Sequence, residues 1–492
     1  MKTLTFYLPQ FHRTPENDKW WGEGFTEWTA VKEAKPLYEG HRQPRKPLNC
    51  NYYNLMEKET MIWQADLMKQ YGIDGQCFYH YYFADGKKIL EKPAENLLEW
   101  KDINMPFCFD WANASWIRTW SNISGGNIWA DKFETKLDED GNGILLEQKY
   151  GREREWKEHF EYVLPFFRDS RYIRYDNKPV FLIHTPNDMP CIHQFIDYWR
   201  ELANKTDIGD IYFIGVNTDQ TKCGLDAVLY NAPHAFWDIK RTNKCLEFDY
   251  PIMWEKILNT KPVDGIRTFF STIPDADNSP RKEYNGAIAK NVSVEIFQEG
   301  MYHLYQKSRS LGNEIVFINA WNEWGEGMYL EPDEDNGHAY LEAVREAQRR
   351  ALESNNVVGE CEDNYELKIS VDWKSKLARC LNRWLDNKEL GKRIADYLKN
   401  HEINSVAVYG MGMLGKQLVR ELENSDIAIA CIVDRNKMLS HPKYKIIGPE
   451  NLSDEADALI ITPIKFFDEI YCDVKKLYTK KIFSLEEIVF EL

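Results

Sequence analysis

Residues 315–331 read IVFINAWNEWGEGMYLE, a short apolar run that ends in a cluster of amide, indole and carboxylate side chains. Similar runs rich in Val, Ile, Phe and Tyr recur along the first 350 residues, as expected of strands that helices cover on both faces. Helical periodicity lies between them, for example at 57–71 and 156–167. This alternation over roughly 330 residues predicts a (β/α)8 TIM barrel within residues 1–350. Its eight predicted strands are residues 3–8, 75–81, 106–111, 179–184, 211–216, 227–230, 266–272 and 315–321.

The remainder of the chain predicts a second, smaller α/β domain. Residues 351–400 are expected to form a linker, centred on the polar stretch 354–363, and connecting amphipathic helices within 373–400. Residues 401–492 then alternate again between strand-like and helical segments. The strands expected there are residues 405–409, 427–433, 458–462 and 481–484, with a helix at 416–423.

A glycine motif follows the first strand of this smaller domain. Gly410-x-Gly412-x-x-Gly415 opens a helix, and Asp434 ends the next strand. In Rossmann-like domains such glycines leave backbone N–H groups accessible to a phosphate, and the acid binds a ribose hydroxyl. We therefore predict that these four residues bind a nucleotide or nucleotide sugar. A docking or degenerate module is the alternative, because about 90 residues form only half of a classical dinucleotide domain.

Composition excludes several classes of function. The 492 residues include 62 Lys and Arg against 78 Asp and Glu, a net charge of −16. This acidic balance argues against a nucleic-acid surface or a polybasic membrane anchor. No apolar run approaches the ~20 residues of a transmembrane helix, and the N-terminus alternates like a strand rather than a signal peptide. The ten cysteines form no C-x-x-C pair, so we expect a reduced, cytoplasmic protein without a metal site.

Polar and aromatic side chains follow the predicted barrel strands at the ends where barrel enzymes carry their active sites. Sugars need such a mixture, because hydroxyls require directional donors and acceptors and pyranose faces stack on indole rings. Glycoside chemistry uses two carboxyl groups, and Glu323 and Glu326 are the candidate catalytic pair. Glycines at 325 and 327 would let the backbone turn so that both acids face one pocket.

The candidate substrate-binding residues are spread over the strand ends. Stacking is expected from Trp20, Trp21, Trp111 and Trp321, hydroxyl contacts from His12, Asp110, Asn113 and Asn322, and further contacts from Tyr79, Tyr81 and His234. Glu27, His184 and Arg281 are other polar residues near these ends. Each residue alone has an ordinary explanation, since a strand-end Glu often caps a helix and the Trp and Tyr residues could be core. Because all of them are expected at the same rim of the barrel, the sequence favours a substrate-binding site there.

Five separated motifs carry a resemblance to a known family. FYLPQFH at 6–12, WWGEGFTEW at 20–28, YGIDG at 71–75, DWAN at 110–113 and NAWNEWGEG at 319–327 resemble WbsX-type proteins. These are glycoside-hydrolase-family-99-like proteins encoded in bacterial surface-polysaccharide clusters, and the similarity covers about residues 1–350. The resemblance implies a (β/α)8 barrel that acts on glycans.

The resemblance also implies roles for the two acids. In the family 99 endo-mannosidases the last motif is WNEWHEG, in which the first Glu is the base on the substrate 2-hydroxyl and gives a 1,2-anhydro sugar. The second Glu is the acid/base at the glycosidic oxygen. These roles fall on Glu323 and Glu326, and the family His between them is Gly325 here. The C-terminal domain resembles the small Rossmann-like modules appended to sugar-modifying enzymes.

We therefore predict a carbohydrate-active enzyme of surface-polysaccharide biosynthesis, such as lipopolysaccharide O-antigen or capsule, that makes or cleaves a glycosidic bond in a Trp-lined cleft. No cofactor is required in the barrel, and the substrate is a glycan or a sugar nucleotide. Other polysaccharide-assembly enzymes are possible partners. The acid pair favours hydrolysis, whereas the missing export signal favours synthesis. A non-catalytic glycan-binding scaffold is the alternative; an NAD-dependent oxidoreductase is weaker because no residues for nicotinamide chemistry are evident.

Overall fold

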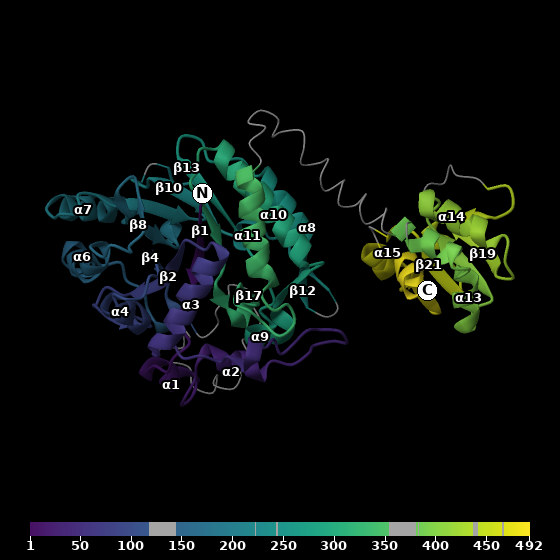
Figure 1. Cartoon of the computed structure of the whole chain (residues 1–492), viewed down its shortest axis with the longest axis horizontal. Helices are drawn as coiled ribbons and strands as arrows, with labels where there is room; N and C mark the ends of the chain where they lie inside the picture. The colour runs from purple at the N-terminus through teal and green to yellow at the C-terminus, as the bar shows by residue number, and fades with distance from the viewer. Residues whose placement is uncertain are drawn as a thin grey trace. The chain divides into compact units, whose positions relative to one another are not determined.

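The structure is a computed structural model that describes residues 1–117, 144–221, 223–242, 245–353, 380–381, 383–435, 441–464 and 467–492. The chain divides into two compact units, Met1–Cys361 and Glu362–Leu492 (Figure 1). The expected linker at 354–363 lies outside the described residues.

Within the described part of the first unit, eight parallel strands close into a barrel. The first strand pairs with both the second and the last, so that Leu4 lies opposite Gly75 on one side and Phe317 on the other. The predicted (β/α)8 barrel is confirmed, with most strand ends within one or two residues of expectation. The strands are β1 (Lys2–Tyr7), β2 (Gly75–Tyr82), β4 (Phe107–Trp111), β8 (Lys178–Ile183), β9 (Tyr212–Val216), β10 (Ala227–Tyr230), β13 (Arg267–Thr272) and β15 (Ile315–Ile318).

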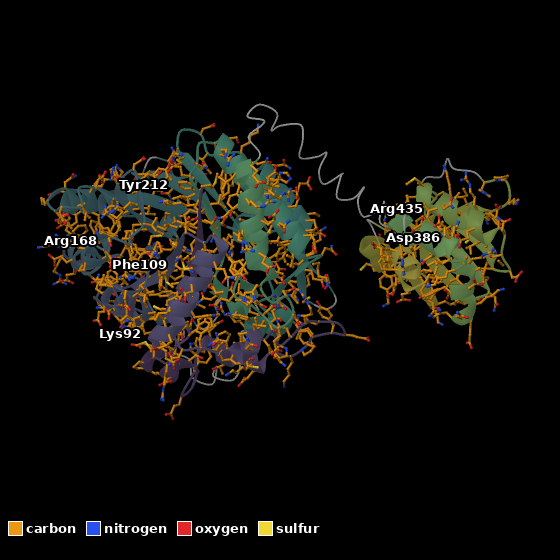
Figure 2. The ribbon with its side chains drawn as sticks, in the orientation of Figure 1. Lys92, Phe109, Arg168, Tyr212, Asp386 and Arg435 are labelled. Carbon is orange, nitrogen blue, oxygen red and sulfur yellow. The ribbon has the colours of Figure 1, made fainter. Side chains whose placement is uncertain are left out.

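Helices cover the outside of the barrel (Figure 1). Their apolar faces pack on the strands, as Trp199 does on Phe181 with ring centroids 5.0 Å apart. Figure 2 shows Phe109 inside this unit, whereas Lys92 and Arg168 lie at its periphery. The long helices are α3 (Lys58–Tyr71), α4 (Lys92–Glu99), α6 (Glu153–Phe167), α7 (Ile192–Asn204), α8 (Tyr250–Asn259), α10 (Val294–Ser310) and α11 (Ala339–Glu353).

Short elements gather at one end of the barrel, where Figure 1 places α1, α2, α9 and β17 together. They are α1 (Pro15–Trp21), α2 (Glu27–Glu33), α9 (Ser279–Lys282), β16 (Asn322–Glu323), η5 (Trp324–Glu326) and β17 (Met328–Tyr329). The remaining short elements of this unit are η1 (Leu48–Cys50), β3 (Lys88–Ile89), β5 (Trp116–Ile117), β6 (Ile144–Leu146), β7 (Arg174–Tyr175), η2 (Pro186–Asp188), η3 (His234–Phe236), β11 (Lys240–Arg241), β12 (Leu246–Asp249), η4 (Glu283–Asn285) and β14 (Ala287–Lys290).

The second unit is built on one parallel sheet with the strand order β20-β19-β18-β21-β22. All four strands expected from the sequence are present, and the two-residue β20 was not expected. Buried side chains pack on both faces of the sheet: Val408 contributes to one core and Leu459 to the other. Its elements are α13 (Ile394–Asn400), β18 (Ser405–Tyr409), α14 (Met413–Leu422), β19 (Ala428–Val433), β20 (Ile446–Ile447), η6 (Pro449–Asn451), β21 (Ala458–Ile461), α15 (Phe467–Val474), β22 (Lys481–Ser484) and α16 (Leu485–Glu491).

Candidate active site

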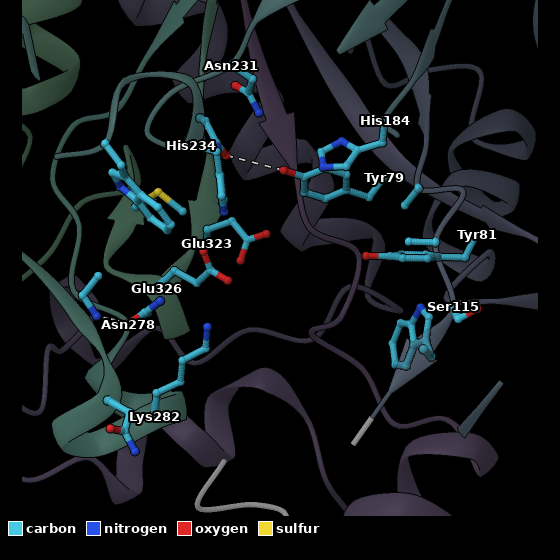
Figure 3. A pocket seen from close by; sticks show the side chains of 18 residues that line it. Tyr79, Tyr81, Ser115, His184, Asn231, His234, Asn278, Lys282, Glu323 and Glu326 are labelled. Atoms are coloured by element: carbon cyan, nitrogen blue, oxygen red, sulfur yellow. Dashed lines mark hydrogen bonds between the residues drawn. The ribbon is translucent and has the colours of Figure 1, made fainter. Parts of the chain in front are cut away.

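A cavity of about 450 Å³ opens at the C-terminal ends of the barrel strands (Figure 3). Its volume is ordinary for a small-ligand pocket. Two carboxyl groups, two phenols and two imidazoles converge on it from four barrel strands or the turns after them. These groups belong to Glu323, Glu326, Tyr79, Tyr81, His184 and His234.

The turn that carries the two acids is fixed by its neighbours. The predicted strand 315–321 ends earlier, at Ile318, because residues 322–323 leave the barrel to pair with β17 in a short antiparallel ladder. The Asn322 side chain accepts a hydrogen bond from Leu8 N at 2.8 Å and donates to Leu8 O at 3.1 Å. Gly327 has φ 66°, and a Cβ there would lie 2.7 Å from Asp277 N, so the turn requires glycine. This arrangement directs both acids into the cavity.

Arg281, from α9, joins the two acids to a third. Its Nε and Nη2 donate to Glu27 Oε1 at 2.9 and 2.6 Å, and Nη2 also donates to Glu323 Oε2 at 3.0 Å. Its Nη1 donates to Glu326 Oε1. The side chains of Glu27, Glu323 and Arg281 are only 3%, 9% and 12% exposed, against 23% for Glu326. The cluster is therefore largely shielded from water, and Glu326 is its most accessible acid.

Gly325 makes this cluster sterically possible. A Cβ on Gly325 would lie 1.9 Å from Glu27 Oε1 and 2.8 Å from Arg281 Nε. Contacts of that length are far inside van der Waals range, so any side chain at 325 would displace the Glu27–Arg281 ion pair. The glycine that departs from the expected family motif is thus explained by the ion pair packed against it.

Burial and charge set the protonation of the cluster. Burial is the largest influence on Glu323 and, with the charges of Glu326 and Glu27, raises its pKa to about 8 despite the opposing effect of Arg281. Burial also lowers the pKa of Lys282, against the attraction of Glu326. A carboxyl group with such a pKa holds its proton at neutral pH, as a general acid must.

His184 lies on a different wall of the cavity and is held by a buried carboxylate. Its Nδ1 lies 2.6 Å from Asp110 Oδ2. Burial lowers the His184 pKa, but the charge and hydrogen bond of Asp110 outweigh burial, so the pKa is raised. Because an ionised carboxylate can only accept, Nδ1 carries a proton, and the neutral ring presents Nε2 as a proton acceptor.

The second unit places its glycine motif at the turn between β18 and α14. Gly410 has φ 92°, and a Cβ on Gly415 would lie 1.9 Å from Gly410 O, so local geometry explains both glycines. A Cβ on Gly412 would meet no described atom within 4 Å. Asp434 Oδ2 accepts a hydrogen bond from Met411 N at 2.8 Å, and Asp434 also lines a second cavity of about 540 Å³.

Comparison with known proteins gives the family of this chain. The model of a family described as "Glycosyltransferase WbsX" matches residues 3–344, which is more than half of the chain. The chain belongs to the WbsX glycosyltransferase family. A separate family, "C2185-like, N-terminal", matches residues 402–483, so the Rossmann-like interpretation of this region stays a prediction.

Similar proteins include a curated relative and two solved structures. The uncharacterized protein WxcX of Xanthomonas campestris pv. campestris (strain ATCC 33913) is 32% identical over 363 residues, which cover 71% of this chain and 50% of the relative. The chain thus spans about half the length of that relative. The GH99 endo-alpha-mannosidase of Bacteroides thetaiotaomicron is 13% identical with a TM-score of 0.45, covering 72% of this chain and 98% of the other. A family 5 xyloglucanase of Paenibacillus pabuli is 7% identical with a TM-score of 0.37, covering 70% and 98%.

Five of the residues predicted from the WbsX-like motifs and strand ends line the cavity of this WbsX-family chain. They are Glu323, Glu326, Tyr79, Tyr81 and His234. Asp110 does not line it but holds His184, which does.

Four other predicted contacts are buried and do not line this cavity. Trp111 Nε1 donates to Tyr82 O, and Trp321 Nε1 donates to Glu331. Asn113 and Asn322 exchange hydrogen bonds with the main chain. Their polar atoms therefore hold loops together.

The three predicted residues nearest the N-terminus also lie outside the lining of this cavity. Trp21 is buried and packs on Phe25, while the half-buried Trp20 packs on Trp116 with ring centroids 5.5 Å apart. His12 is buried, which lowers its pKa to about 4. Their predicted contacts with sugar stay predictions.

The indoles that do line the cavity, Trp116 and Trp237, were not predicted from the sequence, and neither was Lys282. Trp116 begins β5, Trp237 follows η3 and Lys282 ends α9, so none of them lies at an expected strand end or within a recognised motif. Among the described residues, no helix is both long and apolar enough to cross a bilayer.

Proposed function

We propose that this chain makes or cleaves a glycosidic bond during bacterial surface-polysaccharide biosynthesis, using Glu323 and Glu326 as its two acids. The observation that carries the proposal is that both carboxyl groups enter one cavity at the C-terminal mouth of a (β/α)8 barrel. Breaking or making such a bond requires one carboxyl group that protonates or deprotonates the bridging oxygen and one that acts at the sugar.

Other residues of the cavity wall support the proposal that the ligand is a sugar. Trp116 and Trp237 supply indole faces, and His234 packs beside Trp237 with ring centroids 4.3 Å apart. Asn231 and Asn278 add amide groups that can donate to and accept from hydroxyls. A Trp-lined cleft is thus proposed with indoles other than those expected from the sequence.

Incubation with a panel of glycans and sugar nucleotides tests this proposal. New reducing ends would indicate hydrolysis, and consumption of the donor with a longer glycan would indicate transfer. Glu323→Gln and Glu326→Gln should each lower turnover by about 10²–10⁴-fold. Glu342→Gln, an exposed residue of α11, is the matched control and should keep full turnover. Full turnover in both active-site variants would refute the assignment.

For the second unit, we propose binding of a nucleotide or a nucleotide sugar at the Gly410–Gly415 turn. The proposal is supported by the strand order, which places β18 at the centre with the chain running outward on both sides. Gly412 supports it further, because local packing explains the other two glycines but not this one. Close approach of a phosphate to the backbone would explain it.

Titration calorimetry with UDP, ADP and NAD tests this second proposal on the full chain. Gly412→Leu should abolish binding while leaving the melting temperature within about 2 °C of the wild type, because the added side chain enters open space. Equal binding by the variant, or no binding by the wild type, would contradict the proposal.

A further inference from the structure

Three charged residues around the glutamate pair have no role in the function proposed above. We propose that Glu27, Arg281 and Lys282 are positioning residues that hold the pair in its singly protonated state, with the proton on Glu323. This inference rests on the proposed use of Glu323 and Glu326, and concerns what prepares them for it.

The charges in this shielded cluster balance only when the glutamate pair carries one proton. Glu27 is 3% exposed and accepts two of the Arg281 hydrogen bonds, so these two residues form a neutral ion pair. Glu323 and Glu326 then remain with one further cation, Lys282, at the same end of the cavity (Figure 3). Two ionised acids would leave a net negative charge there, whereas one proton makes the cluster neutral. Because uncompensated buried charge is costly, the singly protonated state is favoured.

The surroundings of the two acids differ, and this difference places the proton on Glu323. Glu326 accepts a hydrogen bond from Arg281 Nη1, and the Lys282 amine points toward it in Figure 3. Glu323 shares Nη2 with Glu27, at 3.0 Å against 2.6 Å, and is the more buried of the pair. Glu326 therefore has the stronger stabilisation of a negative charge, and Glu323 the greater cost of carrying one.

Several other titratable groups near the pair leave this count unchanged. On β2, burial raises the pKa values of Tyr79 and Tyr81 well above 10, so both are neutral. Desolvation in the cavity lowers the pKa of His234, which is neutral at pH 7. His184 and Asp110 pair with each other on a different wall.

A single proton on the pair allows it to act as both an acid and a base in one turnover. A pair with one proton can give that proton to the oxygen of a breaking glycosidic bond and take one from an incoming hydroxyl. The pair then ends each turnover with the same number of protons. The resting assignment of the proton to Glu323 reverses the order that the family 99 resemblance implies for the two acids.

Isotope-edited infrared titration of the full chain, labelled with ¹³C-carboxyl glutamate and free of substrate, tests the inference. At pH 7 the wild type should show the band of a protonated buried carboxyl group, which Glu323→Gln removes and Glu326→Gln retains. Lys282→Gln should raise the midpoint of its ionisation by about one to two pH units, because a positive charge is lost. Glu27→Gln should lower the midpoint by a similar amount.

The control is Lys261→Gln, an exposed lysine away from the cavity, which should leave the midpoint unchanged. Absence of the band in the wild type, or shifts of the same sign in Lys282→Gln and Glu27→Gln, would overturn the inference. If Glu27→Gln does not fold, the variant of the half-buried Lys282 tests the inference alone. An unchanged ionisation midpoint in Lys282→Gln would then refute the inference.

This experiment needs no turnover, so the two proposals can fail separately. Opposite shifts of the ionisation midpoint in Lys282→Gln and Glu27→Gln, without activity on any glycan or sugar nucleotide, would support the role of the charge cluster and refute its catalytic purpose. Activity that depends on both acids, with an unmoved midpoint in Lys282→Gln, would support the function and refute the role of the cluster.

Discussion

A single methyl group on Gly325 should destabilise the barrel by an amount that follows from the structure. The Cβ would lie 1.9 Å from Glu27 Oε1, and ordinary contact begins near 3.4 Å, so the oxygen must move by 3.4 − 1.9 = 1.5 Å. That oxygen accepts hydrogen bonds from Arg281 Nε and Nη2 at 2.9 and 2.6 Å, and such a displacement breaks both. At roughly 1.5–3 kcal/mol for each hydrogen bond to a charged group, and with partial relaxation, we expect Gly325→Ala to cost about 3 kcal/mol.

Urea unfolding followed by tryptophan fluorescence measures this cost. Fifteen of the seventeen tryptophans precede residue 325, so the signal reports on the first unit. The control is a double-mutant cycle: in a Glu27→Ala background the methyl group has no oxygen to displace, so Gly325→Ala should then cost less than about 1 kcal/mol. A small loss in the single variant, or equal losses in both backgrounds, would refute the steric explanation of Gly325.

Three further results are expected. Asp110→Asn should lower the raised pKa of His184, as an NMR titration of the imidazole would report; an unchanged pKa would remove Asp110 from its assigned role. Burial raises the pKa of Glu331 to about 7, so the folded chain binds a proton that the unfolded chain has lost, and stability should fall as pH rises from about 4.5 to 7. Glu331→Gln should remove roughly 3 kcal/mol of that fall in urea titrations at pH 5 and pH 8, and parallel curves would contradict this. Trp237→Ala should weaken binding of the active glycan about tenfold by calorimetry, and unchanged affinity would exclude stacking on this indole.

The barrel could be predicted from the sequence because its strands are buried on both faces. Continuous apolar runs such as residues 179–184 stand out between polar helices, and β8 was found within one residue at each end. The last strand was predicted too long. Its apolar pattern continues to Trp321, but Trp321 N bonds to Phe6 O and its indole is held by Glu331, a residue ten positions later that the pattern does not connect to it.

The acid pair could be predicted because both residues lie in one short motif, whereas its surroundings could not. Arg281 and Glu27 are 254 positions apart, and only the fold shows that they meet. The direction in which an aromatic side chain points could not be predicted from the sequence either. Trp111 donates its indole N–H to Tyr82 O in the core, while Trp237 lines the cavity from a loop. Residue type and spacing identify candidates, but side-chain direction depends on partners distant in sequence.

The most direct test of the proposed catalytic centre is a crystal structure of the full chain bound to the glycan that it makes or cleaves. We predict that the anomeric carbon of the reacting sugar lies between the carboxyl groups of Glu323 and Glu326, with the sugar ring against Trp116 or Trp237. A glycan bound elsewhere on the barrel, or an anomeric carbon remote from both carboxyl groups, would contradict it.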